Sequence, residues 1–239
     1  MKDINELIKN NKKYKNTVIQ KRFISKKNTV CYVILNDKPR VLKWYAPGFK
    51  KNMETEYAIL KKGSSKLNMP TPLEKDEENN VIEMSYIIGE NLCDVINDEK
   101  TTSSEKQRLM YLLAEWFSKF HTYFKKTDKI FIRGDSILRN FILTDRIWGV
   151  DFEESRCGKP IEDIIGMCAS ILSTDPMFTD EKLQLCRIFI NSYEKSILRN
   201  LHDVNNEIAY ALLEKIQWRP NDEEVIRKFA QKIRKKGLQ

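Results

Sequence analysis

The stretches FIRGDSILRNFIL (131–143) and GVDFEES (149–155) place two aspartates and one asparagine in a fixed order. Asp135 precedes Asn140 by five residues, and Asp151 follows Asn140 by eleven. Apolar runs flank all three, so short strands are expected to anchor the loops that carry them. Asp and Asn also cap ordinary turns, so this pattern indicates a functional site only if the rest of the chain supplies matching partners.

The order of these side chains suits phosphoryl transfer, a reaction in which the protein mainly positions groups and neutralises charge. One carboxylate must lie beside the acceptor hydroxyl, a role that fits Asp135. An amide and a second carboxylate must hold Mg²⁺ on the phosphates, which fits Asn140 and Asp151. The sequence therefore predicts a phosphoryl-transfer site built from these two loops.

The N-terminal third is predicted to form a small sheet, because apolar and β-branched residues there alternate between turn signals. Its third strand contains the peptide VLKW, and the turn Asp37-Lys38-Pro39 is expected to precede that strand. The expected strands are residues 17–24, 30–36 and 40–45.

Lys43 lies in that third strand, and Glu56 lies in a helix expected at residues 52–62, on the side of its apolar residues. A buried lysine paired with a helix glutamate is how kinases hold nucleotide phosphates. The alternative is that Lys43 and Glu56 are ordinary solvated charges, as either residue type usually is.

The order lysine, glutamate, Asp-x4-Asn, Asp resembles that of the protein-kinase-like superfamily over roughly residues 17–170. The likeness is nearer to aminoglycoside and choline phosphotransferases, and to RIO-type and other minimal archaeal kinases, than to ordinary protein kinases. It implies an α+β, bilobal fold. Residues 1–88 would form a β-sheet N-lobe with one helix that binds nucleotide phosphates, and residues 89–239 a mainly α-helical C-lobe with the catalytic and metal loops.

The same resemblance implies ATP and Mg²⁺ as cofactors and gives each residue a role. Lys43 would bind the α and β phosphates, and Glu56 would orient it. Asp135 would take or align the proton of the acceptor. Asn140 and Asp151 would ligate Mg²⁺.

The stretch VIEMSYIIGENL (81–92) resembles the hinge strand and linker of that superfamily. Met84 would line the back of the adenine pocket, and backbone groups of Ser85 and Ile87 would hydrogen-bond adenine. Asp163, in IEDIIG, matches the acid that starts the next helix and braces the catalytic loop. Its other interpretation is a simple charge at a helix start.

Three departures from the superfamily pattern stand out. SKKN (25–28) replaces the glycine-rich loop that covers the phosphates, so Lys26 or Lys27 would compensate with charge or would be lone surface lysines. Arg133 stands where these relatives commonly have His. Glu153 stands where protein kinases have Gly, as in choline-kinase-like enzymes, and lacks the backbone freedom of that glycine.

The acceptor is expected to be a small molecule with a hydroxyl group. Asp163 follows Asp151 by only twelve positions, which leaves no room for the long activation segment of ordinary protein kinases. An RNA hydroxyl and a protein Ser or Thr are the alternative acceptors. A pseudokinase that binds nucleotide without turnover is the alternative from another class, favoured by the missing glycine-rich loop and by Arg133.

Charge is distributed unevenly along the chain, whose net charge is +8. Residues 1–66 contain seventeen Lys and Arg against five acids, and the tail RKFAQKIRKKGLQ (227–239) adds six bases and no acid. A basic N-lobe and a basic tail would attract RNA. The alternative is a lysine-rich surface composition that serves only solubility.

The remaining features predict a cytoplasmic protein without a membrane segment. No run of eighteen apolar residues and no leader pattern occurs. The five cysteines and two histidines lack zinc, disulfide or Cys/His nucleophile spacing, so the thiols are expected to be structural. Helices are expected after a capping box at Thr102–Glu105 and at residues 161–172, 181–199 and 206–217, with a core that contains Leu109, Leu113, Trp116, Phe117 and Phe120.

Overall fold

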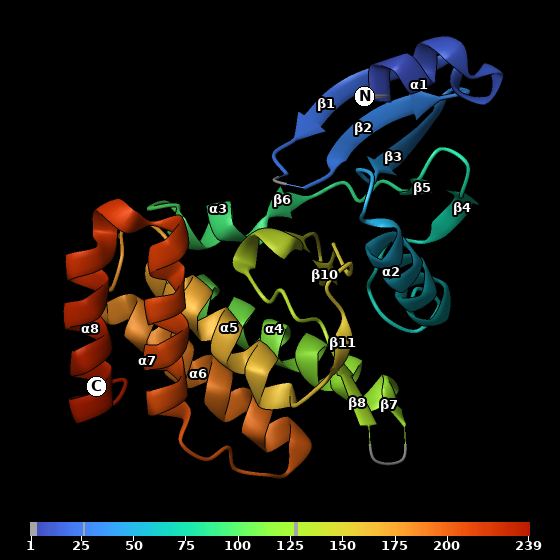
Figure 1. The fold of residues 1–239 in the computed structure, drawn as a ribbon. Coiled ribbons are helices and arrows are strands. Elements are labelled where there is room, and N and C mark those ends of the chain that lie inside the picture. The colour runs from blue at the N-terminus through green and yellow to red at the C-terminus, as the bar shows by residue number, and fades with distance from the viewer. Residues whose placement is uncertain (1–3, 26, 127–128) are drawn as a thin grey trace. The chain divides into compact units, whose positions relative to one another are not determined.

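The computed structural model describes residues 4–25, 27–126 and 129–239, so Lys26 lies outside the described residues. The chain divides into two compact units, Met1–Ile88 with Gly149–Ser155, and Gly89–Trp148 with Arg156–Gln239. The first unit consists of an antiparallel sheet with helices, and the second is mainly helical (Figure 1). The predicted α+β class is confirmed.

The sheet of the first unit has five antiparallel strands in the order β1-β2-β3-β5-β4. The strands are β1 (Thr17–Phe23), β2 (Thr29–Leu35), β3 (Lys38–Trp44), β4 (Pro72–Asp76) and β5 (Val81–Ser85). The edge strand β4 lies in the stretch NMPTPLEKDEENN (68–80), which Pro70 and Pro72 predict to be a loop before the hinge strand. That prediction is wrong because Pro72 is the first residue of an edge strand, where a missing N–H costs no ladder hydrogen bond.

The turn between β2 and β3 differs from the expected Asp37-Lys38-Pro39. Its two central residues are Asn36 and Asp37, both left-handed, with φ of 49° and 59°. Two consecutive positive φ angles define the tight hairpin turn that matches strand twist, and Asn and Asp tolerate it best among residues with a side chain. Pro39 therefore lies within β3, opposite Ile34.

One face of this sheet is covered by an N-terminal segment, helix α1 (Ile4–Asn10) and a 3₁₀ turn at Lys12–Tyr14. A buried cluster joins this segment to the strands and consists of Ile4, Leu7, Tyr14, Cys31, Val33, Leu35, Leu42, Trp44 and Val81. Because side chains alternate along a strand, Lys43 points to the opposite face from Leu42 and Trp44. The remaining helix of this unit is α2 (Lys50–Gly63).

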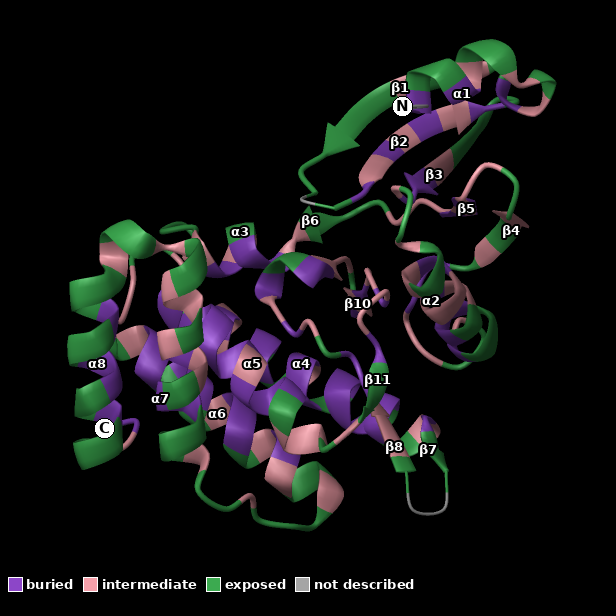
Figure 2. Ribbon diagram, viewed as in Figure 1, coloured by how far each residue is buried: buried purple, intermediate pink, exposed green. Residues whose placement is uncertain are grey.

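The second unit is built on six helices, most of them purple on the inner side in Figure 2, where purple marks buried residues. They are α3 (Leu92–Asn97), α4 (Ser103–Tyr123), α5 (Pro160–Ser173), α6 (Asp180–Ile197), α7 (Val204–Glu214) and α8 (Glu223–Lys236). The side chain of Thr102 caps α4 by accepting the N–H of Glu105 at 3.2 Å. All five core residues predicted for this helix are buried: Leu109, Leu113, Trp116, Phe117 and Phe120.

Two small sheets complete the second unit. One has the order β10-β9-β6 and the other the order β11-β8-β7. Their strands are β6 (Glu90–Asn91), β7 (Lys125–Lys126), β8 (Lys129–Ile132), β9 (Phe141–Leu143), β10 (Ile147–Gly149) and β11 (Arg156–Gly158).

The basic C-terminal stretch is mostly the amphipathic helix α8, with a buried side formed by Ile226, Phe229, Ala230 and Ile233. Of the five cysteines, only Cys157 is exposed. Within the described ranges, no helix combines the length and apolarity needed to cross a membrane.

Candidate active site

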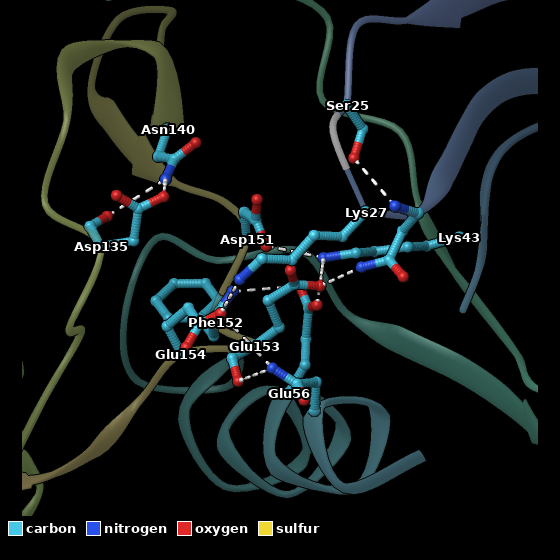
Figure 3. A network of polar contacts seen from close by, with 12 residues as sticks. Ser25, Lys27, Lys43, Glu56, Asp135, Asn140, Asp151, Phe152, Glu153 and Glu154 are labelled. Carbon is cyan, nitrogen blue, oxygen red and sulfur yellow. Dashed lines mark hydrogen bonds and ion pairs between the residues drawn. The ribbon is translucent and has the colours of Figure 1, made fainter. Parts of the chain in front are cut away.

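Three carboxylates surround the ammonium group of Lys43 in the first unit (Figure 3). Its Nζ lies 2.6 Å from Glu56 Oε2, 2.6 Å from Asp151 Oδ1 and 2.9 Å from Glu153 Oε2. Lys43 is 3% exposed and Glu56 is 1% exposed. The two residues are therefore not the solvated charges that the sequence left as an alternative. Oxygens of the three acids lie within 4.8 Å of one another, close enough to share a metal ion.

Local structure fixes Glu56 more firmly than its partners. Its helix α2 directs it inward, where Tyr45 donates its hydroxyl to Oε2 at 2.5 Å. The backbone N–H of Phe152 donates to Oε1 at 3.1 Å. Both oxygens of Glu56 thus have a hydrogen-bond donor in addition to Lys43, so a buried charge is satisfied from two elements.

The electrostatics of this cluster favour a permanently charged lysine. Burial alone lowers the pKa of Lys43, but the charges of Glu56, Asp151 and Glu153 outweigh burial and hold the pKa above its ordinary value. Burial raises the pKa of Glu153; Lys43 opposes the rise, and the neighbouring acids Asp151 and Glu56 add to it. The two shifts are compatible, because one ammonium cannot fully offset three nearby carboxylates.

The loop that begins at Asp151 takes an unusual backbone conformation at that residue. Asp151 has a φ of 63°, in the left-handed region that Asp tolerates better than most residues. Its side chain is 39% exposed, in contrast to Lys43 and Glu56. The carboxylate of Asp151 therefore contacts Lys43 on one side and remains accessible to a ligand.

The loop's next two acids contact the connection between β1 and β2. Asn28, which is 7% exposed, donates its Nδ2 group to Glu153 Oε2 and accepts the backbone N–H of Ala46. Lys27 Nζ lies 2.5 Å from Glu154 Oε1. The lysine of the SKKN stretch that the structure describes is thus engaged by an acid of the Asp151 loop.

The hinge residues lie on and after β5. Met84 pairs with Val41 and is 5% exposed, and alternation puts both on the same sheet face as Lys43. The backbone N–H of Ser85 donates to the carbonyl of Thr71 at 2.9 Å. Because this N–H is used, the backbone group of Ser85 left for a base would be its carbonyl, which could only accept a hydrogen bond. Ile87 is half-buried.

An aromatic pair flanks this hinge and was not identified in the sequence. The rings of Tyr32, on β2, and Tyr86 stack with centroids 3.9 Å apart and an interplanar angle of 10°. Tyr32 pairs with Val41 in the strand register, so it shares the sheet face of Lys43 and Met84.

Asp135 and Asn140 belong to the second unit and form a pair of their own. Asn140 donates its Nδ2 group to the Asp135 carbonyl at 3.1 Å and to Asp135 Oδ2 at 3.2 Å. Gly134 has a φ of 81°, which a residue with a side chain rarely adopts, and a 3₁₀ turn at Leu138–Asn140 brings the amide back toward Asp135. The Asp-x4-Asn spacing thus forms one closed loop.

Asp163, in the first turn of α5, fixes the loop that carries Asp135 and Asn140. It is 1% exposed and accepts the backbone N–H groups of Arg133 at 2.7 Å and Gly134 at 3.0 Å. His121 Nε2 lies 3.0 Å from the same carboxylate, and His121 Nδ1 lies 2.8 Å from the Tyr193 hydroxyl. Burial alone would raise the pKa of Asp163, but these hydrogen bonds and His121 hold it below its ordinary value.

Arg133 is fully buried. Its guanidinium group lies 4.7 Å from the ring centroid of Phe141 and 5.4 Å from that of Trp116. Planar guanidinium groups stack favourably on aromatic faces. Arg133 therefore places a cation inside the aromatic core beside the loop of Asp135.

The sequence did not reveal three polar side chains that contact the predicted site residues or Glu153. They are Tyr45, His121 and Asn28, which contact Glu56, Asp163 and Glu153 respectively. Tyr45 follows Lys43 by two residues and therefore lies on the same side of the chain, which is a usable signal. A lone His on an apolar helix face, such as His121, is usually a satisfied core residue, and its partners come from α5 and α6. Asn28 carries no local signal beyond its place in a turn.

Comparisons with known proteins agree with this architecture. No protein-family model and no curated protein matches the sequence significantly. Among solved structures, APH(2″)-IIa in complex with gentamicin matches with a TM-score of 0.62 and 14% identity, over 97% of this chain and 95% of that one. A Ralstonia eutropha JMP134 protein provisionally described as an aminoglycoside phosphotransferase matches with a TM-score of 0.66 and 13% identity, over 90% of each chain.

A third solved structure is the GDP complex of a variant of aminoglycoside 2′-phosphotransferase-IIIa. It matches with a TM-score of 0.58 and 13% identity, over 92% of this chain and 93% of that one. The likeness covers nearly the whole chain, so the predicted resemblance in fold to aminoglycoside phosphotransferases is confirmed. At these identities it establishes the fold and leaves the activity to the residues of the site.

Proposed function

We propose that this protein is an ATP- and Mg²⁺-dependent phosphotransferase that moves the γ-phosphoryl group to a hydroxyl of a small molecule. The observation that carries the proposal is the buried Lys43–Glu56 ion pair with Asp151 on the same ammonium. Burying an ammonium group is costly, and this one is retained among acids from a helix and a loop. That arrangement suits a lysine that must stay charged and oriented for nucleotide phosphates.

Each residue has a role in this reaction. Lys43 binds the α and β phosphates, and Glu56 orients it. The acceptor oxygen forms a bond to the γ-phosphorus while the bond from that phosphorus to the β–γ bridging oxygen breaks, and ADP leaves with the electron pair. Asp135 aligns the acceptor hydroxyl and takes its proton.

The residues proposed for Mg²⁺ have suitable donor atoms. Asn140 directs its Nδ2 group at Asp135, so its amide oxygen is the atom that it would offer to a metal. Asp151 offers a partly exposed carboxylate. Amide and carboxylate oxygens are the hard donors that Mg²⁺ prefers, and the ion would neutralise phosphate charge. Asn140 and Asp151 therefore suit the metal that the fold implies.

A small-molecule acceptor is favoured by the short segment after the Asp151 loop. The three-residue strand β11 follows, and α5 begins at Pro160, which leaves no peptide-docking segment. One structural neighbour was solved with gentamicin, a small molecule. Another was solved with GDP, so GTP should be tested beside ATP as the phosphoryl donor.

An RNA hydroxyl is the second candidate acceptor, on the observation of a basic side on α8. Lys228, Lys232, Lys235 and Lys236 are exposed along that helix. If RNA is the acceptor, its affinity should fall steeply with salt, because phosphate contacts release counterions.

The test is transfer of ³²P from γ-labelled ATP or GTP into total RNA, a small-metabolite extract and denatured protein, with Asp135→Asn as the control. Label that requires Asp135 and Mg²⁺ supports the proposal, and the labelled pool identifies the acceptor class. Nucleotide binding with no label in any pool would support the pseudokinase alternative instead.

A further inference from the structure

Glu153 is one of three carboxylates that surround the ammonium group of Lys43, with its Oε2 2.9 Å from Nζ. An ammonium group has three N–H donors, and three carboxylates lie within 2.9 Å of Nζ. A phosphate oxygen can bind Lys43 only if one of these carboxylates gives up its place. Figure 3 shows the three acids converging on this one nitrogen.

Glu153 is the carboxylate that can leave. Glu56 is held at both oxygens, by Tyr45 and by the backbone of Phe152, and is 1% exposed. Asp151 is the proposed Mg²⁺ ligand, so it should keep its place when nucleotide binds. Among the described residues, the Glu153 carboxylate accepts one further hydrogen bond, from the side chain of Asn28, and only its backbone carbonyl is held by Asn52.

The Glu153 carboxylate and a phosphate group are both negatively charged, so they should not contact Lys43 at the same time. A phosphate bound at Lys43 would lie within contact distance of the Glu153 carboxylate, in a buried site where repulsion is only weakly screened. The rest of the loop would respond, because Glu153 and Glu154 hold Asn28 and Lys27 of the β1–β2 connection. Displacing Glu153 would release Asn28. Asn28 belongs to the SKKN stretch, which stands where the protein-kinase-like superfamily has the loop that covers the phosphates.

We propose that Glu153 sets the nucleotide affinity of this site: its carboxylate holds Lys43 in the nucleotide-free protein, and nucleotide phosphates bind by displacing it. This inference rests on the proposed function, because it assumes that Lys43 binds phosphate. Glu153, which stands where protein kinases have Gly, would then have a role in nucleotide affinity that is separate from metal binding.

The test is the dissociation constant of ATP, measured by calorimetry on the full chain with EDTA and with Mg²⁺. Glu153→Gln keeps the size of the side chain and can still accept from Asn28, but removes the charge. It should bind ATP about tenfold more tightly in both conditions, the effect of losing one charged competitor. Glu54→Gln, which neutralises an acid of α2 that pairs with Lys75 and not with Lys43, is the matched control and should bind like the wild type. Melting curves report whether the variants fold.

Each other outcome overturns the inference in a recognisable way. Equal ATP affinity of the wild type and Glu153→Gln would show that Glu153 does not compete with phosphate for Lys43. The proposed function would not be affected by that result. Weaker binding of Glu153→Gln with Mg²⁺ but not with EDTA would make Glu153 a metal ligand. No binding of ATP or GTP by any folded variant would reject both the competition and the proposed function.

Discussion

His121 and Asp163 form a buried pair beneath the loop of Asp135, with His121 Nε2 3.0 Å from Asp163 Oδ2. The same carboxylate accepts the backbone N–H groups of Arg133 and Gly134. His121 touches none of the proposed reacting groups, so it is a positioning residue that acts through Asp163. Its loss should loosen a loop that the proposed chemistry needs in one geometry.

His121→Phe is expected to lower kcat about ten- to a hundredfold while changing KM for nucleotide little, because loop misplacement affects the chemical step. His121→Gln offers an amide N–H toward Asp163 and should recover part of the rate. Steady-state kinetics on folded protein measures both. Tyr193→Phe, which removes only the outer hydrogen bond, is the control and should have the smaller effect. If kcat falls only in proportion to the fraction of folded protein, His121 stabilises the core and does not position the loop.

Asp163 should make the protein acid-sensitive. Its pKa in the folded state lies below the ordinary value of 3.8, so its ionised form contributes stability above that value and loses it as pH falls through the folded pKa. Urea unfolding from pH 6 down to pH 3 should show a decline in the free energy of unfolding that is shallower in Asp163→Asn. Parallel curves for the two proteins would contradict this assignment.

Lys182 should make the free energy of unfolding increase with pH at alkaline pH as well. It is 3% exposed, donates to the carbonyl and the hydroxyl of Thr174, and burial lowers its pKa to about 8 from an ordinary 10.5. The folded state then loses the proton before the unfolded state does, so the free energy of unfolding should rise between about pH 8 and pH 10.5. The rise should be smaller in Lys182→Met. A variant with the same pH slope as the wild type would exclude Lys182 as its source.

The two proposed reaction acids should separate binding from turnover. Asp135→Asn is expected to abolish phosphoryl transfer and to leave nucleotide binding largely intact, since Asp135 is assigned to the acceptor. Asp151→Asn should weaken the Mg²⁺-dependent part of nucleotide binding. Calorimetry with and without Mg²⁺, combined with the ³²P assay, measures both effects. If the wild type and both variants bind Mg·ATP alike and none turns over, the enzyme interpretation is wrong.

Local patterns predicted the longer strands and most of the long helices, and they missed several elements, among them α1, α3, α8 and β4. Alternating apolar residues located β2 and β3, and helical spacing located α4 to α6 within a few residues. Helix α1 was missed because INELIKN is mostly polar and buries only Ile4 and Leu7. Strand β4 was missed because its prolines and acids suit an edge as well as a loop.

The candidate site was predictable as a set of residue types, and less so as a set of contacts. Lys43, Glu56 and Asp151 were named from their order, and they lie together, while their roles stay predictions. The bond between Asn28 and Glu153 joins residues 125 positions apart, and that between His121 and Asp163 joins residues 42 apart. Such pairs depend on tertiary packing, for which no local pattern in a single sequence gives a signal.

The distribution of the five thiols gives this protein a natural labelling position. Burial raises the pKa of Cys31, Cys93 and Cys186, and Cys168 is also buried, so thiol-reactive dyes should select the exposed Cys157 on β11. β11 pairs with β8, whose last residue immediately precedes the Arg133-Gly134-Asp135 stretch. A fluorophore on the unmutated chain would thus report, in real time and without an engineered cysteine, on ligands that reach this neighbourhood.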